Sequence, residues 1–82
     1  QYLRYGYMGK PITHKHILES FGSKMQEVSQ AKGVTQEKLA EMLSMHRTYI
    51  GLIERGERNP TIRTLYKIAK ALKVKSSELL PF

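Results

Sequence analysis

Cysteine and aspartate are absent from this chain of 82 residues, and its apolar residues never form a long run. The lack of cysteine excludes disulfide bonds and metal sites built from thiolates. No apolar stretch approaches the roughly 18 residues that a membrane-spanning helix requires, and no signal-peptide core is present. We therefore expect a single cytoplasmic domain with one small core and no contact with a membrane.

The same absences argue against catalysis. His14 and His16 flank Lys15 without a third metal ligand nearby in the sequence, and no Ser–His–carboxylate grouping is apparent. A chain of this length also has little room for a core together with a deep catalytic cleft. We therefore expect no enzymatic activity, no metal and no cofactor.

Basic residues are concentrated in the second half of the chain. The net charge is +7, and between residues 44 and 75 only Glu54 and Glu57 oppose the arginines and lysines. Residues 17–43 are slightly acidic by contrast. Such an uneven distribution favours a polyanionic partner such as nucleic acid. The alternative is a basic surface that only keeps the protein soluble.

The first 16 residues match no packed element. Tyrosines alternate there with glycine, proline and basic residues, so we expect residues 1–16 to form a flexible leader. An arm that lies along DNA or across a second subunit is the alternative. Because the chain begins with glutamine, Met8 is a candidate for the natural first residue.

The remaining residues, 17–82, show helical periodicity and no strand pattern, which predicts an all-α, compact five-helix bundle. Apolar residues at helical spacing predict a helix over residues 17–32 that Gly33 ends. A second long helix begins at its cap, Thr61, and runs to about Lys73. Ser76 begins a last short helix that reaches Leu80.

Residues 35–55 predict two short helices joined by a tight turn. Thr35 caps the first helix, and the small side chain of Ala40 allows the second helix to cross it closely. This arrangement is typical of a helix-turn-helix, which presents its second helix to the major groove of DNA. The residues between the apolar stripes are expected to face outward: Arg47, Thr48, Gly51 and Leu52.

From about Phe21 to Leu80 the sequence resembles the phage repressor and Cro family of helix-turn-helix transcriptional regulators (XRE-type). The matching blocks are Gly33-Val34-Thr35-Gln36-Glu37-Lys38-Leu39-Ala40, Tyr49-Ile50, Ile53-Glu54-Arg55-Gly56 and Asn59-Pro60-Thr61. Residues 47–55 also resemble the controller proteins of restriction–modification systems. The chain departs from the family at His46, where Ser, Thr or Asp usually caps the recognition helix, and at Gly51 and Leu52, where polar residues are common.

The resemblance implies a DNA-binding site. Arg47 and Thr48 match positions that contact base edges, and Gln36 matches one that bridges a phosphate and the recognition helix. Arg55, Arg58 and Asn59 would hold phosphates, with Thr61 and its helix N-terminus as a further anchor. The implied site is therefore Gln36, His46, Arg47, Thr48, Tyr49, Gly51, Leu52, Arg55, Arg58, Asn59 and Thr61. Glu54 is expected to have a salt-bridge partner.

The resemblance also implies a homodimer that sets two recognition helices about 34 Å apart over a two-fold symmetric operator. The candidate dimer interface is Val74, Leu79, Leu80 and Phe82, although Leu79 also suits the monomer core. We expect a nucleoid-associated transcriptional regulator whose partner is double-stranded DNA, without a small-molecule ligand. The alternative is an antitoxin that binds a partner protein as well as DNA.

Overall fold

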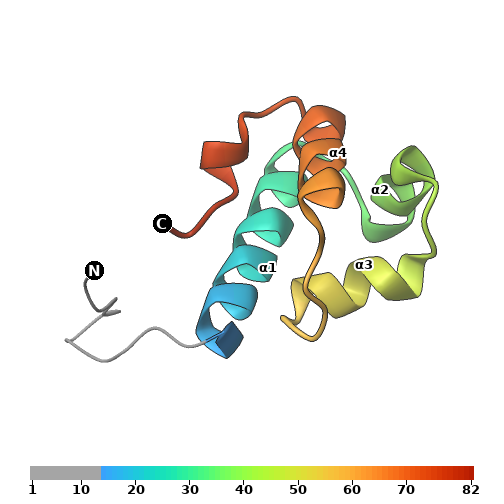
Figure 1. The fold of residues 1–82 in the computed structure, drawn as a ribbon. Helices are drawn as coiled ribbons and strands as arrows, with labels where there is room; N and C mark the ends of the chain where they lie inside the picture. Colours follow the sequence, from blue (N-terminus) through green and yellow to red (C-terminus); the bar gives the residue numbers. More distant parts are fainter. Residues whose placement is uncertain (1–13) are drawn as a thin grey trace.

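The computed structural model describes residues 14–82, and the regular structure in that range is entirely helical (Figure 1). Four α-helices follow one another: α1 (His14–Ala31), α2 (Gln36–Leu43), α3 (Arg47–Glu54) and α4 (Ile62–Leu72). The all-α helix-turn-helix fold that the sequence predicts is therefore present. None of these helices is long and apolar enough to cross a bilayer, as judged over the described residues.

The predicted fifth helix is wrong as an α-helix. In its place lies η2 (Ser76–Glu78), a single turn of 3₁₀-helix in which the backbone N–H of Lys75 donates to Oε2 of Glu78 over 3.1 Å. Lys73 ends α4 in the left-handed conformation and Lys75 is the next N-cap, so only the residues from Ser76 to Leu80 remain before Pro81, too few for a stable α-helix.

Helix α1 begins earlier than its hydrophobic pattern indicates. It includes residues 14–16, which the sequence assigned to the leader, while residues 1–13 lie outside the described part of the chain. The helix ends near Gly33, whose φ of 72° is the left-handed conformation that suits a glycine after a helix. The predicted stop signal is therefore confirmed.

The core lies among the four helices: α3 packs against both α1 and α2, and α2 also packs against α4 (Figure 1). Its apolar side chains come from every helix and from the C-terminal segment, which explains why so short a chain can bury a continuous cluster. The fully buried members are Met25, Leu39, Ile50, Ile53, Ile68, Leu72 and Leu79.

Two glycines let α1 and the end of α3 approach each other closely. A Cβ at Gly22 would collide with the backbone carbonyl oxygens of Ile53 and Glu54. Gly56 has a φ of 76°, and a Cβ there would lie 2.8 Å from the Cα of Glu19. The C-terminal end of α3 is thereby held against α1, and this contact sets how the opposite end of α3 is presented.

Candidate nucleic-acid interface

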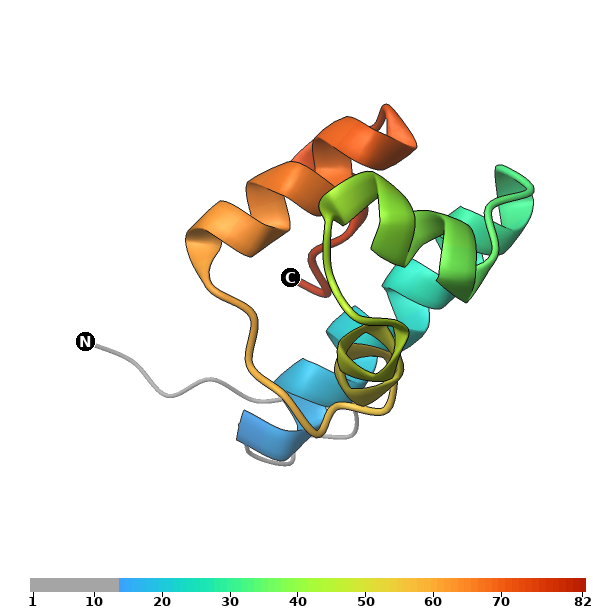
Figure 2. The ribbon, with the colours of Figure 1, turned by 90° about the vertical axis from the view of Figure 1, so that its right-hand side faces the viewer.

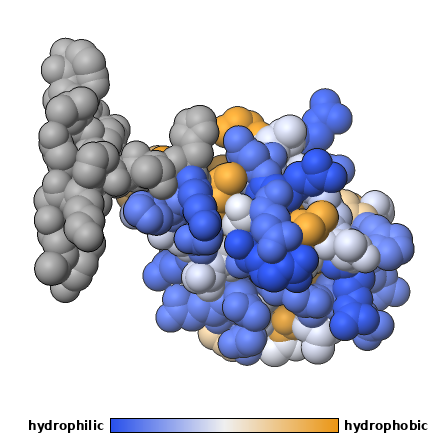
Figure 3. Space-filling view, turned by 90° about the horizontal axis from the view of Figure 1, so that it is seen from below, coloured by the Kyte–Doolittle hydropathy of each residue, from blue (hydrophilic) through white to orange (hydrophobic). Residues whose placement is uncertain are grey.

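Helices α2 and α3 form the predicted helix-turn-helix. The turn between them depends on Ser44, which adopts the left-handed conformation with φ of 55° and caps α2. In Figure 2, α3 is seen almost end-on and lies below α2. Figure 3 shows that the face carrying α3 is mostly hydrophilic, with only scattered hydrophobic residues.

The N-terminal end of α3 is exposed to solvent. Arg47 and Thr48 occupy its first two positions, and both are exposed. Nη1 of Arg47 lies 4.0 Å from Oε2 of Glu37 on α2, an ion pair between two exposed side chains. Such a pair holds the guanidinium only weakly, so Arg47 is free to contact another group.

His46 caps α3 in spite of being an unusual residue for that position. Its Nδ1 accepts a hydrogen bond from the backbone N–H of Thr48 over 3.2 Å. The backbone of His46 is extended, with φ of −77° and ψ of 141°, as an N-cap requires. His46 therefore caps α3 although it differs from the Ser, Thr or Asp that is usual in the family.

Gln36 links the two helices of the motif. Its Nε2 donates to Oε1 of Glu54 over 2.6 Å, which joins the first residue of α2 to the last residue of α3. The sequence predicted a bridge from Gln36 but directed its N–H to a phosphate, and it predicted a salt bridge for Glu54. Glu54 has instead this hydrogen bond, which leaves the second amide hydrogen of Gln36 for another acceptor.

Gly51 is not the open outward position that the sequence indicated. Gly51 is buried, since the side chains of Arg55 and Gln36 lie close to it. A Cβ at this position would lie 3.2 Å from Nη1 of Arg55 and 3.9 Å from Nε2 of Gln36. Leu52 is partly buried. The absence of a side chain at Gly51 makes room for the guanidinium of Arg55, which sequence periodicity does not reveal.

The basic residues after α3 are held by neighbours that the sequence analysis did not identify. Nε of Arg55 donates to Oε2 of Glu57 over 3.1 Å. The guanidinium of Arg58 lies over the ring of Tyr49, 5.6 Å from its centroid. In the sequence, only the two-residue spacing of Arg55 and Glu57 indicated that these two side chains could pair.

The two polar residues of the next loop differ in their availability. Asn59 is exposed. The hydroxyl of Thr61 instead caps α4, since it accepts from the backbone N–H of Thr64 over 3.1 Å and also lies 3.2 Å from the hydroxyl of Thr64. The Thr61 side chain thus stabilises α4 first, and its part in an anion anchor remains a prediction.

The predicted dimer residues do not share one environment. Leu79 is 0% exposed and belongs to the monomer core, Val74 and Leu80 are partly buried, and Phe82 is 73% exposed. A second apolar surface, which the sequence analysis missed, lies on α4, where Ile62 is 81% and Tyr66 is 61% exposed.

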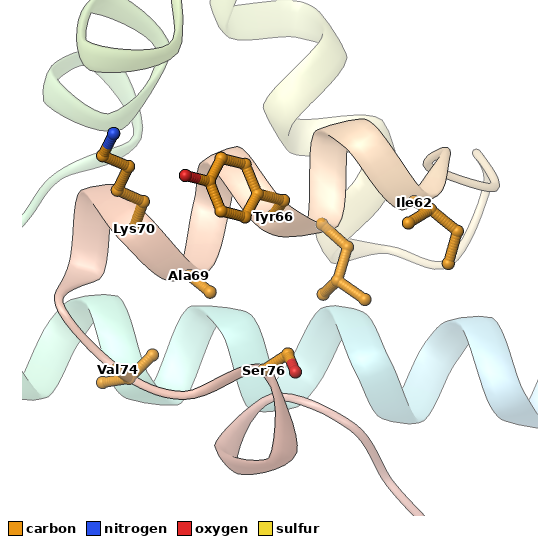
Figure 4. Close-up of a pocket in the computed structure, with 7 residues that line it drawn as sticks. Ile62, Tyr66, Ala69, Lys70, Val74 and Ser76 are labelled. Carbon is orange, nitrogen blue, oxygen red and sulfur yellow. The ribbon is translucent and has the colours of Figure 1, made fainter.

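This surface borders a shallow hollow of about 290 Å³ between α4 and the segment from Val74 to Ser76 (Figure 4). Ala69 lies along it, and Nζ of Lys70 lies 5.8 Å from the centroid of the Tyr66 ring. The hollow is separate from the surface at the N-terminal end of α3.

Comparisons with known proteins agree with this geometry. The family described as helix-turn-helix matches residues 25–79. Control protein C.BamHI of Bacillus amyloliquefaciens is 46% identical over 63 residues, which cover 76% of this chain and 78% of that protein. Control protein C.SmaI of Serratia marcescens is 42% identical over 69 residues, which cover 84% and 82%.

Solved structures give the same result. The restriction-modification controller protein C.AhdI from Aeromonas hydrophila matches with a TM-score of 0.74 and 40% identity, covering 77% of this chain and 96% of that one. The controller protein C.Esp1396I, solved as a tetramer in complex with its natural 35 base-pair operator, matches with a TM-score of 0.66 and 41% identity. That match covers 72% of this chain and 78% of the other.

Proposed function

Because this chain belongs to the helix-turn-helix family of DNA-binding transcriptional regulators, which are not enzymes, we propose that it is a controller protein that binds a two-fold symmetric operator as a homodimer. The observation that carries this proposal is the exposed N-terminal end of α3, with Arg47 and Thr48 at its first two positions. In a helix-turn-helix this end of the second helix contacts base edges in the major groove.

Base contacts and phosphate contacts come from different residues. The planar guanidinium of Arg47 matches O6 and N7 of guanine, and Thr48 can bind a base or touch a thymine methyl group. Arg55, Arg58 and Asn59 follow α3 and are exposed, so they suit phosphates, and the remaining amide hydrogen of Gln36 suits another. Arg47 would leave its weak pairing with Glu37 when it binds DNA.

One recognition helix contacts too few base pairs for selectivity within a genome, so two subunits are needed. A relative of this chain was solved as a tetramer on a 35 base-pair operator, which supports assembly of several copies on one site. In this chain, Ile62, Tyr66 and Phe82 offer exposed apolar surface that a second copy would cover. We propose that these residues, rather than the buried Leu79, form the centre of the dimer interface.

A selection of bound duplexes from a random-sequence pool tests the function. We expect the recovered sites to contain a two-fold symmetric sequence, because a two-fold dimer contacts both half-sites alike. Arg47→Ala should weaken binding to the recovered site by about 1–3 kcal/mol and relax preference at one base pair in each half-site. Equal losses on recovered and random duplexes would make Arg47 a phosphate contact, and recovery of no sequence at all would refute the proposal.

A further inference from the structure

We propose that His46 both caps α3 and donates a hydrogen bond from Nε2 to an acceptor on the DNA duplex. This inference rests on the proposed function, because it adds a specific contact to the same DNA-facing surface. It starts from the geometry of the cap, in which Nδ1 of His46 accepts from the backbone N–H of Thr48 over 3.2 Å.

The cap determines which nitrogen of the ring carries the proton. Nδ1 can accept a hydrogen bond only with a free lone pair, so the proton of the ring is on Nε2. Nε2 is the ring nitrogen that the cap does not use. His46 is exposed, and within residues 14–82 no group accepts a hydrogen bond from Nε2. The cap therefore leaves the N–H group at Nε2 of His46 as an exposed donor without a partner in this part of the chain.

This donor lies beside the residues proposed to contact bases. His46 immediately precedes Arg47 and Thr48, at the end of α3 that enters the groove in this motif. In the major groove, the duplex offers such a donor two kinds of hydrogen-bond acceptor. These are the phosphate oxygens and the O6, O4 and N7 atoms of the bases. A carboxylate at this position would cap the helix but would repel phosphates, whereas the imidazole can cap with one nitrogen and donate with the other.

Three substitutions separate the two roles. His46→Ala removes both nitrogens and should lower both stability and affinity. Asparagine places a polar group near the position of Nδ1 and is a strong N-cap, so His46→Asn should restore the stability that His46→Ala loses, but not the affinity. Glutamine reaches toward the position of Nε2, so His46→Gln should restore affinity to the folded protein, but not its stability.

Affinity is measured on the duplex that the wild-type protein recovers from a random pool and on a scrambled duplex of the same length. We expect His46→Asn to bind the recovered duplex about 3- to 10-fold more weakly per subunit than the wild type. The same loss on both duplexes assigns the contact to a phosphate, and a loss on the recovered duplex alone assigns it to a base edge.

Two results would overturn the inference without touching the proposed function. One is a His46→Asn variant that binds the recovered duplex as tightly as the wild type does. The other is ¹⁵N NMR of the free protein that places the ring proton on Nδ1. If the wild-type protein recovers no preferred sequence, the proposed function fails, and this inference fails with it.

Discussion

Nε2 of Gln36 donates to Oε1 of Glu54 over 2.6 Å, so the start of α2 is tied to the end of α3. The two residues are 18 positions apart in the chain and partly buried. A charged acceptor in such surroundings makes this a strong hydrogen bond. The other polar contact between α2 and α3 is the weak, exposed pair of Arg47 and Glu37, so this bond contributes most of the polar contact that orients α3 relative to the first residues of α2.

Gln36→Ala should therefore reduce both stability and DNA binding. Loss of a hydrogen bond to a charged and partly buried acceptor should cost about 1–2 kcal/mol of the free energy of unfolding, measured with denaturant. Affinity for DNA should fall on every sequence, because the proposed phosphate contact is lost together with the fixed direction of α3. Gln26→Ala, at an exposed position of α1, is the control and should change neither quantity.

Gly51→Ala should separate stability from DNA binding. Alanine is better than glycine within a helix by up to about 1 kcal/mol, and the new Cβ would displace only the flexible end of Arg55, 3.2 Å away. We therefore expect the free energy of unfolding to rise by about 0.5–1 kcal/mol, while affinity for any duplex falls because Arg55 has moved.

Gly22→Ala provides the contrast to that substitution. Its Cβ would meet the backbone carbonyl oxygens of Ile53 and Glu54, which cannot move aside cheaply, so stability should fall by about 3 kcal/mol. If Gly51→Ala also destabilises the protein, the space at Gly51 is filled by something less flexible than the Arg55 side chain.

Local pattern and capping explain why the helices could be predicted. Thr35 and Thr61 cap α2 and α4 as expected, and Gly33 and Gly56 adopt the left-handed conformation after α1 and α3. These features depend on neighbours within one turn, which the sequence shows directly.

The features that were missed depend on side-chain contacts that periodicity does not show. Gly51 looked open, yet the side chains of Arg55, one turn further along, and of Gln36 on α2 both lie close to it. Ile62 and Tyr66 occupy helical positions near the apolar stripe of α4, but no second layer in the described structure covers them. Periodicity indicates an apolar face without indicating which part of it the monomer buries.

Arg58→Ala tests the proposed phosphate contacts. Removing one phosphate contact should reduce the slope of log K against log salt concentration by about 0.9 per subunit, equally for recovered and scrambled duplexes. Tyr49 holds the guanidinium by a cation–π contact, so Tyr49→Leu should produce part of the same loss. Lys24→Ala removes a positive charge from α1, where Lys24 pairs with Glu27 over 3.9 Å, and should leave the slope unchanged. An unchanged slope for Arg58→Ala would exclude it from the site.

The α4 surface should control dimerisation. Ile62 and Tyr66 are both mostly exposed, so Ile62→Ser combined with Tyr66→Ser should leave the monomer folded. Each apolar side chain that a partner fully buries contributes about 1.5–3 kcal/mol, so the dimer dissociation constant in sedimentation equilibrium should rise at least about 10-fold.

Met42→Ser is the matched control for this double variant, because Met42 is a partly exposed apolar residue on α2, away from the hollow. It should leave the dissociation constant unchanged. Phe82→Ser should weaken the dimer if the interface extends to the C-terminal end of the chain. Should Phe82→Ser alone dissociate the dimer while the α4 double variant does not, the interface lies at that end and the α4 hollow is not part of it.

A dissociated variant should also lose affinity for a complete two-fold site far more than for an isolated half-site, because only the complete site needs two α3 helices held at a fixed spacing.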